Sequence, residues 1–547
     1  MKLISYDINK KYKKSVAYFS MEFAIDQALK IYSGGLGFLA GSHMRSVYDL
    51  KQNVVGIGLL WSFGYYDQTR NEDRTLRPTF TRKFYYFLEE LDVDVKVRIH
   101  NQEVKIKAFL VKPEVFGSAP IILLSTDIDE NDYLARTITH KLYDGNERTR
   151  VAQEIVLGIG GTKVLEALNH KVDIYHMNEG HALPLVYELY AKFKDMNEIR
   201  KRVVFTTHTP EAAGNEIHNI NFLHEMGFFN GLDMKTIREI SGYQNDDNFS
   251  LTVGALRSAK IANAVSKIHE KVSNEMWSNV EGRCEIISIT NAQNKKYWTD
   301  KTLIRNLDEH EDYELVARKK HLKKLLFDIV ADQTGKMFDP EILTIVWARR
   351  FAEYKRPGLL KYDLERFENL MKNTKMPVQI IWAGKPYPGD FGAIDLFNEL
   401  IDISHHYTNM AVLIGYELTL SKFLKQGSDI WLNTPRITRE ASGTSGMTAS
   451  MNGSVHFSVD DGWHPEFARD GKNAFTIPQL DHKMSIEEQD RLDNKNMMDI
   501  LEDKIIPTYY NNHKKWVEIM KNAMTEIEID FDSGRMAEQY YKKMFNH

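Results

Sequence analysis

The stretch Val378–Asp390 reads VQIIWAGKPYPGD, an apolar run of strand length followed by a polar turn with glycines and prolines. The same pattern, an apolar run followed by Gly, Pro, Asn or a His/Thr turn, recurs along the chain. The other runs are Ile121–Ser125, Val203–Thr207, Ile342–Trp347, Met410–Ile414 and Ile430–Leu432. Amphipathic helical patterns lie between and after them, as in Pro184–Asp195 and Ser485–Asp503. Buried strands that alternate with helices predict an α/β fold with parallel sheets.

Length and composition narrow the class of protein. A chain of 547 residues is too long for one hydrophobic core, so two large domains are expected. The net charge is -5 and there is no basic tail, which argues against nucleic-acid binding. Cys284 is the only cysteine, so an internal disulfide is impossible and a reducing cytoplasm fits. We also expect no signal peptide and no membrane-spanning segment, because no apolar run is long enough.

A domain boundary is expected near Ser288–Asn294, where a helix-rich stretch gives way to a charged helical segment and a new series of strands. This divides the chain into residues 1–288 and 289–547, with a C-terminal helical region that crosses back. In open α/β sheets, ligands bind at the carboxyl ends of the strands. The polar turns that follow the apolar runs are therefore the candidate binding segments.

The first candidate is the glycine loop, residues 32–37 (YSGGLG). Adjacent glycines let the backbone approach a ligand, and a following helix offers N–H groups to an anion. It is not a dinucleotide-binding fingerprint, because the third glycine is missing at the required spacing. A plain turn is the alternative interpretation.

Basic residues follow the run Ile342–Trp347, in the segment 348–356 (ARRFAEYKR). Several cations at a strand end form a natural clamp for phosphate, although a solvated basic helix start is the alternative. Two histidine-containing turns follow other strands: FTTHTP at residues 205–210, and HMNEGH at residues 176–181. A lone histidine there is ordinarily structural, and the HMNEGH spacing is not that of a zincin, so no metal site is predicted.

The segment 440–453 reads EASGTSGMTASMNG. Such a glycine-, serine- and threonine-rich turn opening a helix can bind sugar hydroxyls and phosphate through backbone N–H groups. It is not a nucleophile elbow, because Gly443-Thr-Ser445-Gly-Met lacks the final glycine.

Together these motifs, with YFSMEF at residues 18–23, resemble the α-glucan (glycogen, starch, maltodextrin) phosphorylases, in particular their short bacterial and archaeal form. The resemblance extends from about Val16 to about Pro478. It implies the GT-B glycosyltransferase fold, with two Rossmann-like domains facing across a catalytic cleft. Residues 1–288 would form the glucan side, and residues 289–547 the phosphate or sugar-donor side.

The resemblance also implies residue roles. His208 would touch the transferred glucose, and Arg350 and Lys355 would grip the substrate phosphate, which makes these three the predicted catalytic residues. Thr444 would hold the phosphate of the cofactor pyridoxal phosphate (PLP). The predicted substrate-binding residues are Gly35, Leu36, Asn291, Glu440, Ser442 and Gly443.

Thr448 departs from the family pattern, because phosphorylases carry there the lysine that forms the Schiff base with PLP. A threonine has no amine and cannot form an imine. We therefore expect PLP to bind non-covalently at most, or not at all. Three functions stay open: an α-1,4-glucan phosphorylase with loosely held PLP, an ADP- or UDP-glucose-dependent glucan glucosyltransferase, and a non-catalytic glucan-binding pseudophosphorylase.

The expected partners are an α-1,4-glucan or maltodextrin, with phosphate or a sugar phosphate. The analysis of composition predicts neither a nucleic-acid nor a membrane partner. Because family members are often homodimers, the resemblance suggests a homodimer.

Overall fold

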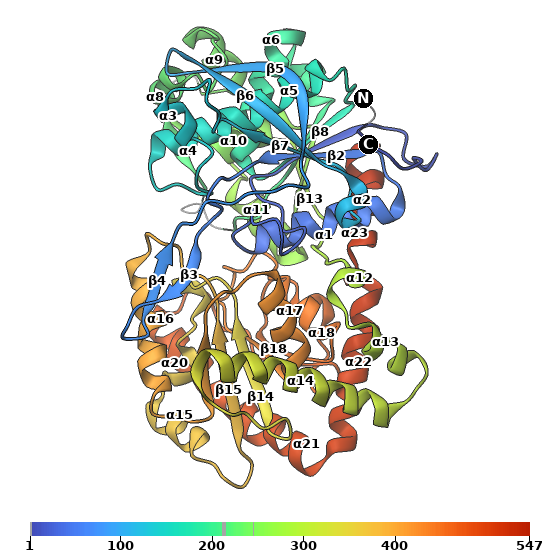
Figure 1. Ribbon diagram of the computed structural model, residues 1–547, viewed down its shortest axis with the longest axis vertical. Helices are drawn as coiled ribbons and strands as arrows, with labels where there is room; N and C mark the ends of the chain where they lie inside the picture. The colour runs from blue at the N-terminus through green and yellow to red at the C-terminus, as the bar shows by residue number, and fades with distance from the viewer. Residues whose placement is uncertain (1–2, 211–214, 244–245, 547) are drawn as a thin grey trace. The chain divides into compact units, whose positions relative to one another are not determined.

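The structure is a computed structural model that describes residues 3–210, 215–243 and 246–546 (Figure 1). The chain forms two compact units, each of which is described by itself. Unit 1 contains the described residues of Met1–Tyr66, Phe80–Asn291 and Ser533–His547, and unit 2 contains Asp67–Thr79 and Ala292–Asp532. Among the described residues, no helix is both long and apolar enough to span a membrane.

A nine-stranded sheet forms the centre of unit 1, in the order β13-β12-β9-β8-β1-β2-β7-β6-β5. Its strands from β13 to β7 pair in parallel, and most of their residues are buried because helices cover both faces. The strands are β1 (Val16–Phe19), β2 (Val54–Leu59), β5 (Glu89–Ile99), β6 (Gln102–Val111), β7 (Ile121–Ser125), β8 (Ile174–Asn178), β9 (Val203–Thr206), β12 (Ile261–Ala264) and β13 (Glu285–Ser288).

The edge of this sheet differs from the expected parallel pattern, because β5 and β6 pair antiparallel and β6 pairs antiparallel with β7. A two-residue turn joins β5 to β6, and both turn residues have positive φ, 45° at His100 and 65° at Asn101. Two consecutive residues of that kind make the tight turn that suits the twist of a hairpin. Charged and apolar residues alternate along β5, as expected for a strand with one solvated face.

Helices of unit 1 connect these strands, and a separate two-stranded antiparallel sheet pairs β10 (Ile217–Asn219) with β11 (Asn248–Ser250). α23 packs against α1, so a C-terminal segment returns to unit 1. The longer helices are α1 (Gly35–Leu50), α4 (Glu147–Ile155), α5 (Gly161–Ala167), α6 (Pro184–Phe193), α8 (Ile220–Met226), α9 (Met234–Ser241), α10 (Leu251–Ser258), α11 (Lys267–Met276) and α23 (Ser533–Tyr540).

Unit 2 contains a six-stranded, fully parallel sheet in the order β16-β15-β14-β17-β18-β19. Counted along the chain this is 3-2-1-4-5-6, the order of a doubly wound sheet whose ligands bind beside the first and fourth strands. The strands are β14 (Leu343–Ala348), β15 (Val378–Ala383), β16 (Met410–Leu413), β17 (Ile430–Asn433), β18 (Val455–Val459) and β19 (Ala474–Ile477).

The main helices of unit 2 surround this sheet, as Figure 1 shows. They are α13 (Lys301–Asp308), α14 (Asp312–Thr334), α15 (Leu364–Met371), α16 (Phe391–Ser404), α17 (Leu418–Gly427), α18 (Ser445–Ser450), α20 (Ile486–Ile500), α21 (Ile506–Asn511) and α22 (His513–Phe531).

Three segments depart from the division between residues 288 and 289, and one of them is 289–291, which belongs to unit 1. The hairpin of β3 (Asp67–Arg70) and β4 (Leu76–Thr79) belongs to unit 2, although it lies early in the chain. Its Gln68 side chain donates to the Gly384 carbonyl at 2.8 Å and accepts from the Gly415 N–H at 3.0 Å. Residues from Ser533 onward belong to unit 1.

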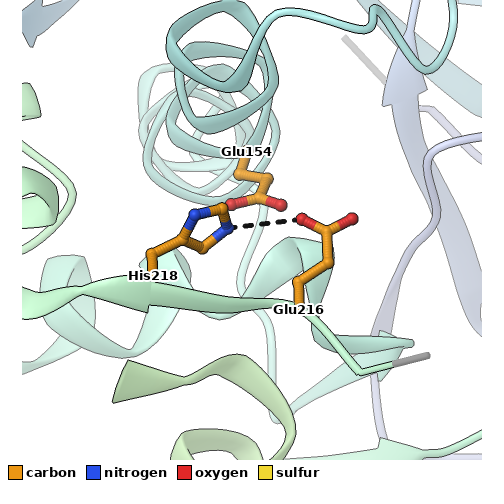
Figure 2. Close-up of side chains that lie close together, drawn as sticks. All are labelled: Glu154, Glu216 and His218. Atoms are coloured by element: carbon orange, nitrogen blue, oxygen red, sulfur yellow. Dashed lines mark hydrogen bonds and ion pairs between the residues drawn. The ribbon is translucent and has the colours of Figure 1, made fainter. Parts of the chain in front are cut away.

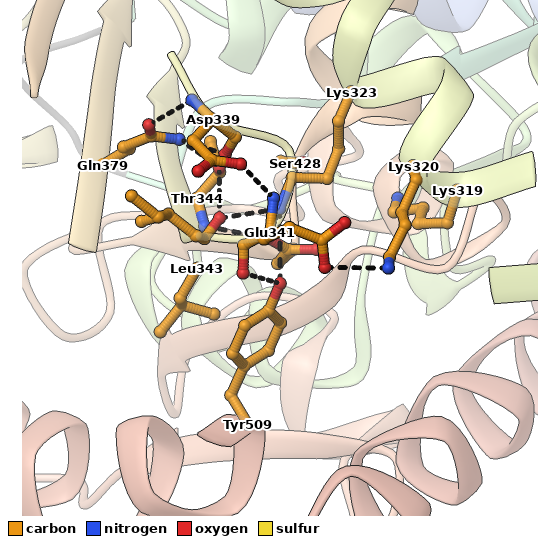
Figure 3. Close-up of polar contacts among 12 residues, drawn as sticks. Lys319, Lys320, Lys323, Asp339, Glu341, Leu343, Thr344, Gln379, Ser428 and Tyr509 are labelled. Carbon is orange, nitrogen blue, oxygen red and sulfur yellow. Dashed lines mark hydrogen bonds and ion pairs between the residues drawn. The ribbon is translucent and has the colours of Figure 1, made fainter. Parts of the chain in front are cut away.

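A buried polar network joins α14 to the starts of β14 and β17 (Figure 3). Lys323 Nζ donates to Asp429 Oδ2 at 2.6 Å and to the Ile342 carbonyl at 2.7 Å. The same carboxylate oxygen accepts from the Thr344 N–H at 2.8 Å. Both charged side chains are almost fully buried. The ion pair therefore ties one helix to the first residues of both central strands.

Replacement of Lys323 by Met should destabilise unit 2 by about 3–5 kcal/mol, because the Asp429 carboxylate would stay buried without its counter-charge. Tryptophan fluorescence during urea unfolding measures this, since most tryptophans lie in unit 2. Those in unit 2 are Trp298, Trp347, Trp382, Trp431, Trp463 and Trp516.

Lys320 on the same helix provides the matched control. It pairs with Glu341 at 2.8 Å, but 41% and 63% of these side chains are exposed. Lys320→Met should therefore lower the free energy of unfolding of unit 2 by no more than about 1 kcal/mol. Similar losses in the two variants would show that the buried pair has no special role.

Candidate functional site

The glycine loop of unit 1 surrounds a buried carboxylate. Glu22, just after β1, accepts from the Ser33 N–H at 2.6 Å, the Gly34 N–H at 3.2 Å and the Tyr143 hydroxyl at 2.8 Å. Burial raises the pKa of Glu22, although these bonds favour the ionised form. Gly37 allows this packing, because a Cβ atom there would lie 2.7 Å from Glu22 Oε2. The loop is thus held in place by hydrogen bonds to the buried side chain of Glu22.

The predicted ligand residues of the loop lie at the start of α1. Gly35 is exposed and Leu36 is half-buried. A Cβ atom built on Gly34 or Gly35 would meet no atom within 4 Å, so there is open space above the loop. A helix N-terminus beside open space suits an anionic ligand.

His208 follows β9, and residues of the HMNEGH turn position it. Its backbone N–H donates to Glu179, and its Nε2 lies 2.7 Å from Asn178 Oδ1. Burial lowers the pKa of His208 to about 3, and His269 and His181 add repulsion. The ring is therefore neutral at neutral pH and donates to Asn178 through Nε2. Asn178 and Glu179 thus hold the ring and the backbone of His208 in place.

Asn291 lies after β13 at the end of the long central segment of unit 1. It is buried, and its backbone N–H donates to the Val265 carbonyl at 3.0 Å. Within the described part of the chain, its buried Oδ1 has no hydrogen-bond partner. An oxygen of that kind can accept a bond from a sugar hydroxyl.

In unit 2, the cations after β14 meet the carboxylate of Glu440. Arg349 Nη2 lies 2.8 Å from Glu440 Oε2, and Lys355 Nζ lies 3.0 Å from the same oxygen. Burial alone would raise the pKa of Glu440, but the charges of Arg349 and Lys355 outweigh burial and lower it. Glu440 is therefore ionised. Lys355 of the predicted phosphate clamp is therefore in contact with Glu440, the predicted sugar-binding carboxylate.

Arg349, rather than its neighbour, is the buried arginine of this cluster. It is 5% exposed, and its Nε and Nη1 find no hydrogen-bond partner among the residues described. Arg350 is exposed and acts on Glu440 as a neighbouring charge. The resemblance implied a phosphate contact for Arg350, whereas the structure buries Arg349 beside Glu440.

Arg356, the last cation of the segment, has a structural role. Its guanidinium group binds Asp490 at 2.9 Å and Asp493 at 2.7 Å, both on α20. It also donates to the carbonyls of Thr434 and Pro435. These bonds fix the turn after β17 and leave Arg349 and Lys355 as the buried cations that face Glu440.

The turn between Glu440 and α18 brings three more predicted residues to this cluster. Gly443 has a φ of 83°, and a Cβ atom there would lie 3.1 Å from Glu440 Cγ and 3.4 Å from Arg349 Nη2. Glycine is therefore required both by conformation and by the close approach. Ser442 is buried, and its Oγ has no partner within the described ranges. Thr444 is half-buried at the start of α18.

Thr448 lies inside α18 and is 1% exposed. Its hydroxyl donates to the Ser445 carbonyl at 3.0 Å, an ordinary bond of a helical threonine. The unsatisfied nitrogens of Arg349 and the turn at Gly443 fit a phosphate group, but residue 448 offers no amine. The residues present thus fit the phosphate of PLP and do not fit its imine at this position.

The predicted residues divide between the units. Gly35, Leu36, His208 and Asn291 belong to unit 1, and the remaining seven belong to unit 2. Arg349 belongs to the basic segment 348–356 that the sequence indicated as a phosphate clamp, but the sequence did not distinguish it from Arg350. Asp461 was not predicted.

Asp461 holds the Glu440 backbone, accepting from its N–H at 3.0 Å. Burial raises the pKa of Asp461 from its ordinary 3.8 to about 7, and the nearby Glu440 charge adds to the rise. The folded state thus binds this proton more tightly than the unfolded state, so the contribution of Asp461 to stability falls as the pH rises from about 4 to 7.

Asp461→Asn keeps an acceptor for the Glu440 N–H and cannot ionise. At pH 8 this variant should be more stable than the parent by about 1–4 kcal/mol, and the difference should shrink toward pH 4. Urea unfolding of both proteins across this range measures it. A difference that does not change with pH would refute the assigned pKa.

Comparisons with known proteins identify relatives along nearly the whole chain. A family model described as carbohydrate phosphorylase matches residues 277–499. The maltodextrin phosphorylase of Thermococcus litoralis is 30% identical, over 98% of this chain and 71% of that protein. The glycogen phosphorylase of Aquifex aeolicus is also 30% identical, over 98% and 86%. An uncharacterized protein of Methanocaldococcus jannaschii is 47% identical, over 97% and 100%. The chain therefore belongs to the α-glucan phosphorylase family, as its motifs predicted.

Proposed function

We propose that this protein is a retaining hexosyltransferase that moves glucose between an α-1,4-glucan or maltodextrin and phosphate, with glucose-1-phosphate as the phosphorylated sugar. The observation that carries the proposal is the buried Arg349, whose Nε and Nη1 lack partners among the described residues while Nη2 binds Glu440. A buried guanidinium group with open donors calls for an oxyanion, and phosphate suits its geometry.

The proposal includes the GT-B arrangement, in which two Rossmann-like domains face a catalytic cleft. The strand orders of the two sheets support it, because the parallel part of unit 1 follows the order 3-2-1-4-5-6-7, which extends the 3-2-1-4-5-6 order of unit 2 by one strand. Unit 1 would supply the glucan side through Gly35, Leu36, His208 and Asn291. Unit 2 would supply the phosphate side.

In the proposed reaction, the bond from the anomeric carbon to the glycosidic oxygen breaks, and a bond from that carbon to a phosphate oxygen forms. The phosphate gives its proton to the leaving glycosidic oxygen, so atoms and charge balance. Arg349 and Lys355 would orient the phosphate and neutralise it. Asn291 Oδ1, Ser442 and Glu440 would bind sugar hydroxyls, and neutral His208 would line the glucose site.

The family cofactor PLP is part of the proposal only as a non-covalent ligand. When bound, PLP would supply a second phosphate group beside the substrate phosphate. Thr444, Gly443 and the glycine loop are the residues that would hold that phosphate. Thr448 offers no amine, so covalent attachment there is excluded by its chemistry.

A nucleotide-sugar transferase is the second candidate, and the absence of an amine at Thr448 favours it. A pocket without a covalent cofactor leaves room for a second phosphate, such as the diphosphate of ADP- or UDP-glucose. The glycine loop, with open space above Gly34 and Gly35, would suit that group. The third candidate, a non-catalytic glucan-binding protein, becomes the conclusion if glucan binds without turnover.

Arg349→Ala should weaken phosphate binding by about 2–5 kcal/mol, because it removes one partner of a buried charge pair. Binding of neutral maltodextrin should stay nearly unchanged. Calorimetric titration with phosphate and with maltodextrin measures both, and circular dichroism checks the fold. Equal loss of both ligands would show that Arg349 is structural.

Arg350→Ala is the matched comparison at the adjacent, exposed arginine. Arg350→Ala should weaken phosphate binding by about 1 kcal/mol or less, as expected for an exposed side chain. A larger effect from Arg350 than from Arg349 would restore the assignment made from sequence.

The function is tested by supplying maltodextrin and phosphate, with and without PLP, and measuring glucose-1-phosphate. We expect release that depends on phosphate and rises with added PLP, without a PLP absorbance band that borohydride fixes to the protein. A fixed band would show that another lysine forms the imine. Glucose transfer from ADP- or UDP-glucose, without phosphorolysis, would replace the proposal by the second candidate.

A further inference from the structure

A second group of chemistry-bearing side chains lies in unit 1 and includes none of the predicted substrate residues. Glu154 comes from α4, His218 from β10, and Glu216 directly precedes β10 (Figure 2). One ligand atom from each residue lies within 4.8 Å of the others. Figure 2 shows the Glu154 carboxylate directed toward the His218 ring and the Glu216 carboxylate. The elements α4 and β10 therefore meet at this cluster.

Glu154 is the unusual member. Its side chain is fully buried, and neither carboxylate oxygen has a hydrogen-bond partner within the described residues. A buried carboxylate without partners is costly, unless it is protonated or binds a cation.

The His218 ring is oriented as metal-binding histidines are. Its Nδ1 lies 2.8 Å from Glu147 Oε1, and its Nε2 faces Glu216 Oε2 at 3.4 Å. When Nδ1–H donates to Glu147, the lone pair of Nε2 points into the cluster. A carboxylate on the outer ring nitrogen is the usual second contact of a histidine that binds a metal.

The charges and spacings of the cluster suit a dication. Glu147, Glu154 and Glu216 carry three negative charges. Arg150, which pairs with Glu216 Oε1, contributes one positive charge. With a neutral His218 the sum is two negative charges, which a divalent ion would cancel. Ligand atoms around tetrahedral Zn²⁺ lie roughly 3.3 Å apart. The 3.4 Å between His218 Nε2 and Glu216 Oε2 is close to that spacing.

We propose that Glu154, Glu216 and His218 form a binding site for one divalent transition-metal ion of the Zn²⁺ class. The imidazole nitrogen selects this class over Mg²⁺ and Ca²⁺, which prefer oxygen ligands only. The ion would join α4 to the two-stranded sheet of β10 and β11 and so stabilise unit 1. This site is independent of the proposed sugar transfer.

In the competing explanation, protons rather than a metal ion neutralise the charges of the cluster. In that case an imidazolium at His218 would donate to both Glu147 and Glu216, and Glu154 would be neutral. The two explanations differ in metal stoichiometry, which can be measured directly.

The experiment uses the full chain, stripped with EDTA and titrated with Zn²⁺ at pH 7.5 in a calorimeter. We expect one tightly bound Zn²⁺ per chain, a rise in melting temperature on binding, and no comparable binding of Mg²⁺. Co²⁺ as a coloured substitute should give visible absorption bands that Zn²⁺ removes. Failure of the parent protein to take up stoichiometric Zn²⁺ would overturn the proposal.

Variants locate the ion. Glu154→Gln should abolish the stoichiometric uptake, and Glu147→Gln, at a side chain that is 61% exposed, should weaken it about 10- to 100-fold. Because Glu147 is exposed, its variant stays informative if Glu154→Gln folds poorly. Glu188→Gln, at another glutamate of unit 1 whose carboxylate binds Asn230 at 2.8 Å, is the matched control and should bind as the parent does. Zn²⁺ binding that is unchanged in both cluster variants would place the ion elsewhere and refute the site.

Discussion

The buried ion pair between Lys323 and Asp429 fixes the starting ends of the two central strands of unit 2. Asp429 accepts from the Thr344 N–H through its side chain and donates its own N–H to the Thr344 carbonyl at 2.9 Å. These bonds set β14 and β17 side by side in one register. Because the two strands start in register, their carboxyl ends lie at the same edge of the sheet. Arg349 and the turn that leads to Glu440 therefore lie at that edge. The binding site at one end of the sheet thus depends on an ion pair at the other.

At that edge, the positive charges of Arg349 and Lys355 are already partly neutralised by Glu440. Glu440 lies between Arg349 and Lys355, and the buried Asp461 holds its backbone from the other side. A phosphate that enters must share these cations with Glu440. Such sharing couples the two ligands, because a sugar hydroxyl that binds Glu440 changes how strongly Glu440 holds the cations. The arrangement suits an enzyme that must bind a sugar and an anion together.

Much of this fold follows from local sequence, and the remainder depends on contacts between distant residues. Apolar runs such as Val378–Ala383 and Ile121–Ser125 coincide with β15 and β7, because strands buried on both faces need continuous apolar residues. The antiparallel hairpin of β5 and β6 was not predicted, since β5 alternates charged and apolar residues and so lacks a continuous apolar run. Arg349 and Arg350 are adjacent cations after β14, and the sequence alone does not show which of them is buried. Only the packing of the neighbouring turn decides which.

The net charge of the unit 2 cluster indicates the charge of the ligand that it would bind. Arg349 and Lys355 contact Glu440 directly, and Arg350 adds its field from the exposed side. Three cations facing one carboxylate leave an excess of about two positive charges. A single phosphate group carries about -1.5 to -2 charges at neutral pH and would balance this excess. The diphosphate of a nucleotide sugar is esterified at both ends and carries about -2 charges at neutral pH, so it would balance the same excess. The electrostatics of the cluster therefore suit a ligand with about two negative charges, which phosphate, a sugar phosphate and a nucleotide sugar each provide.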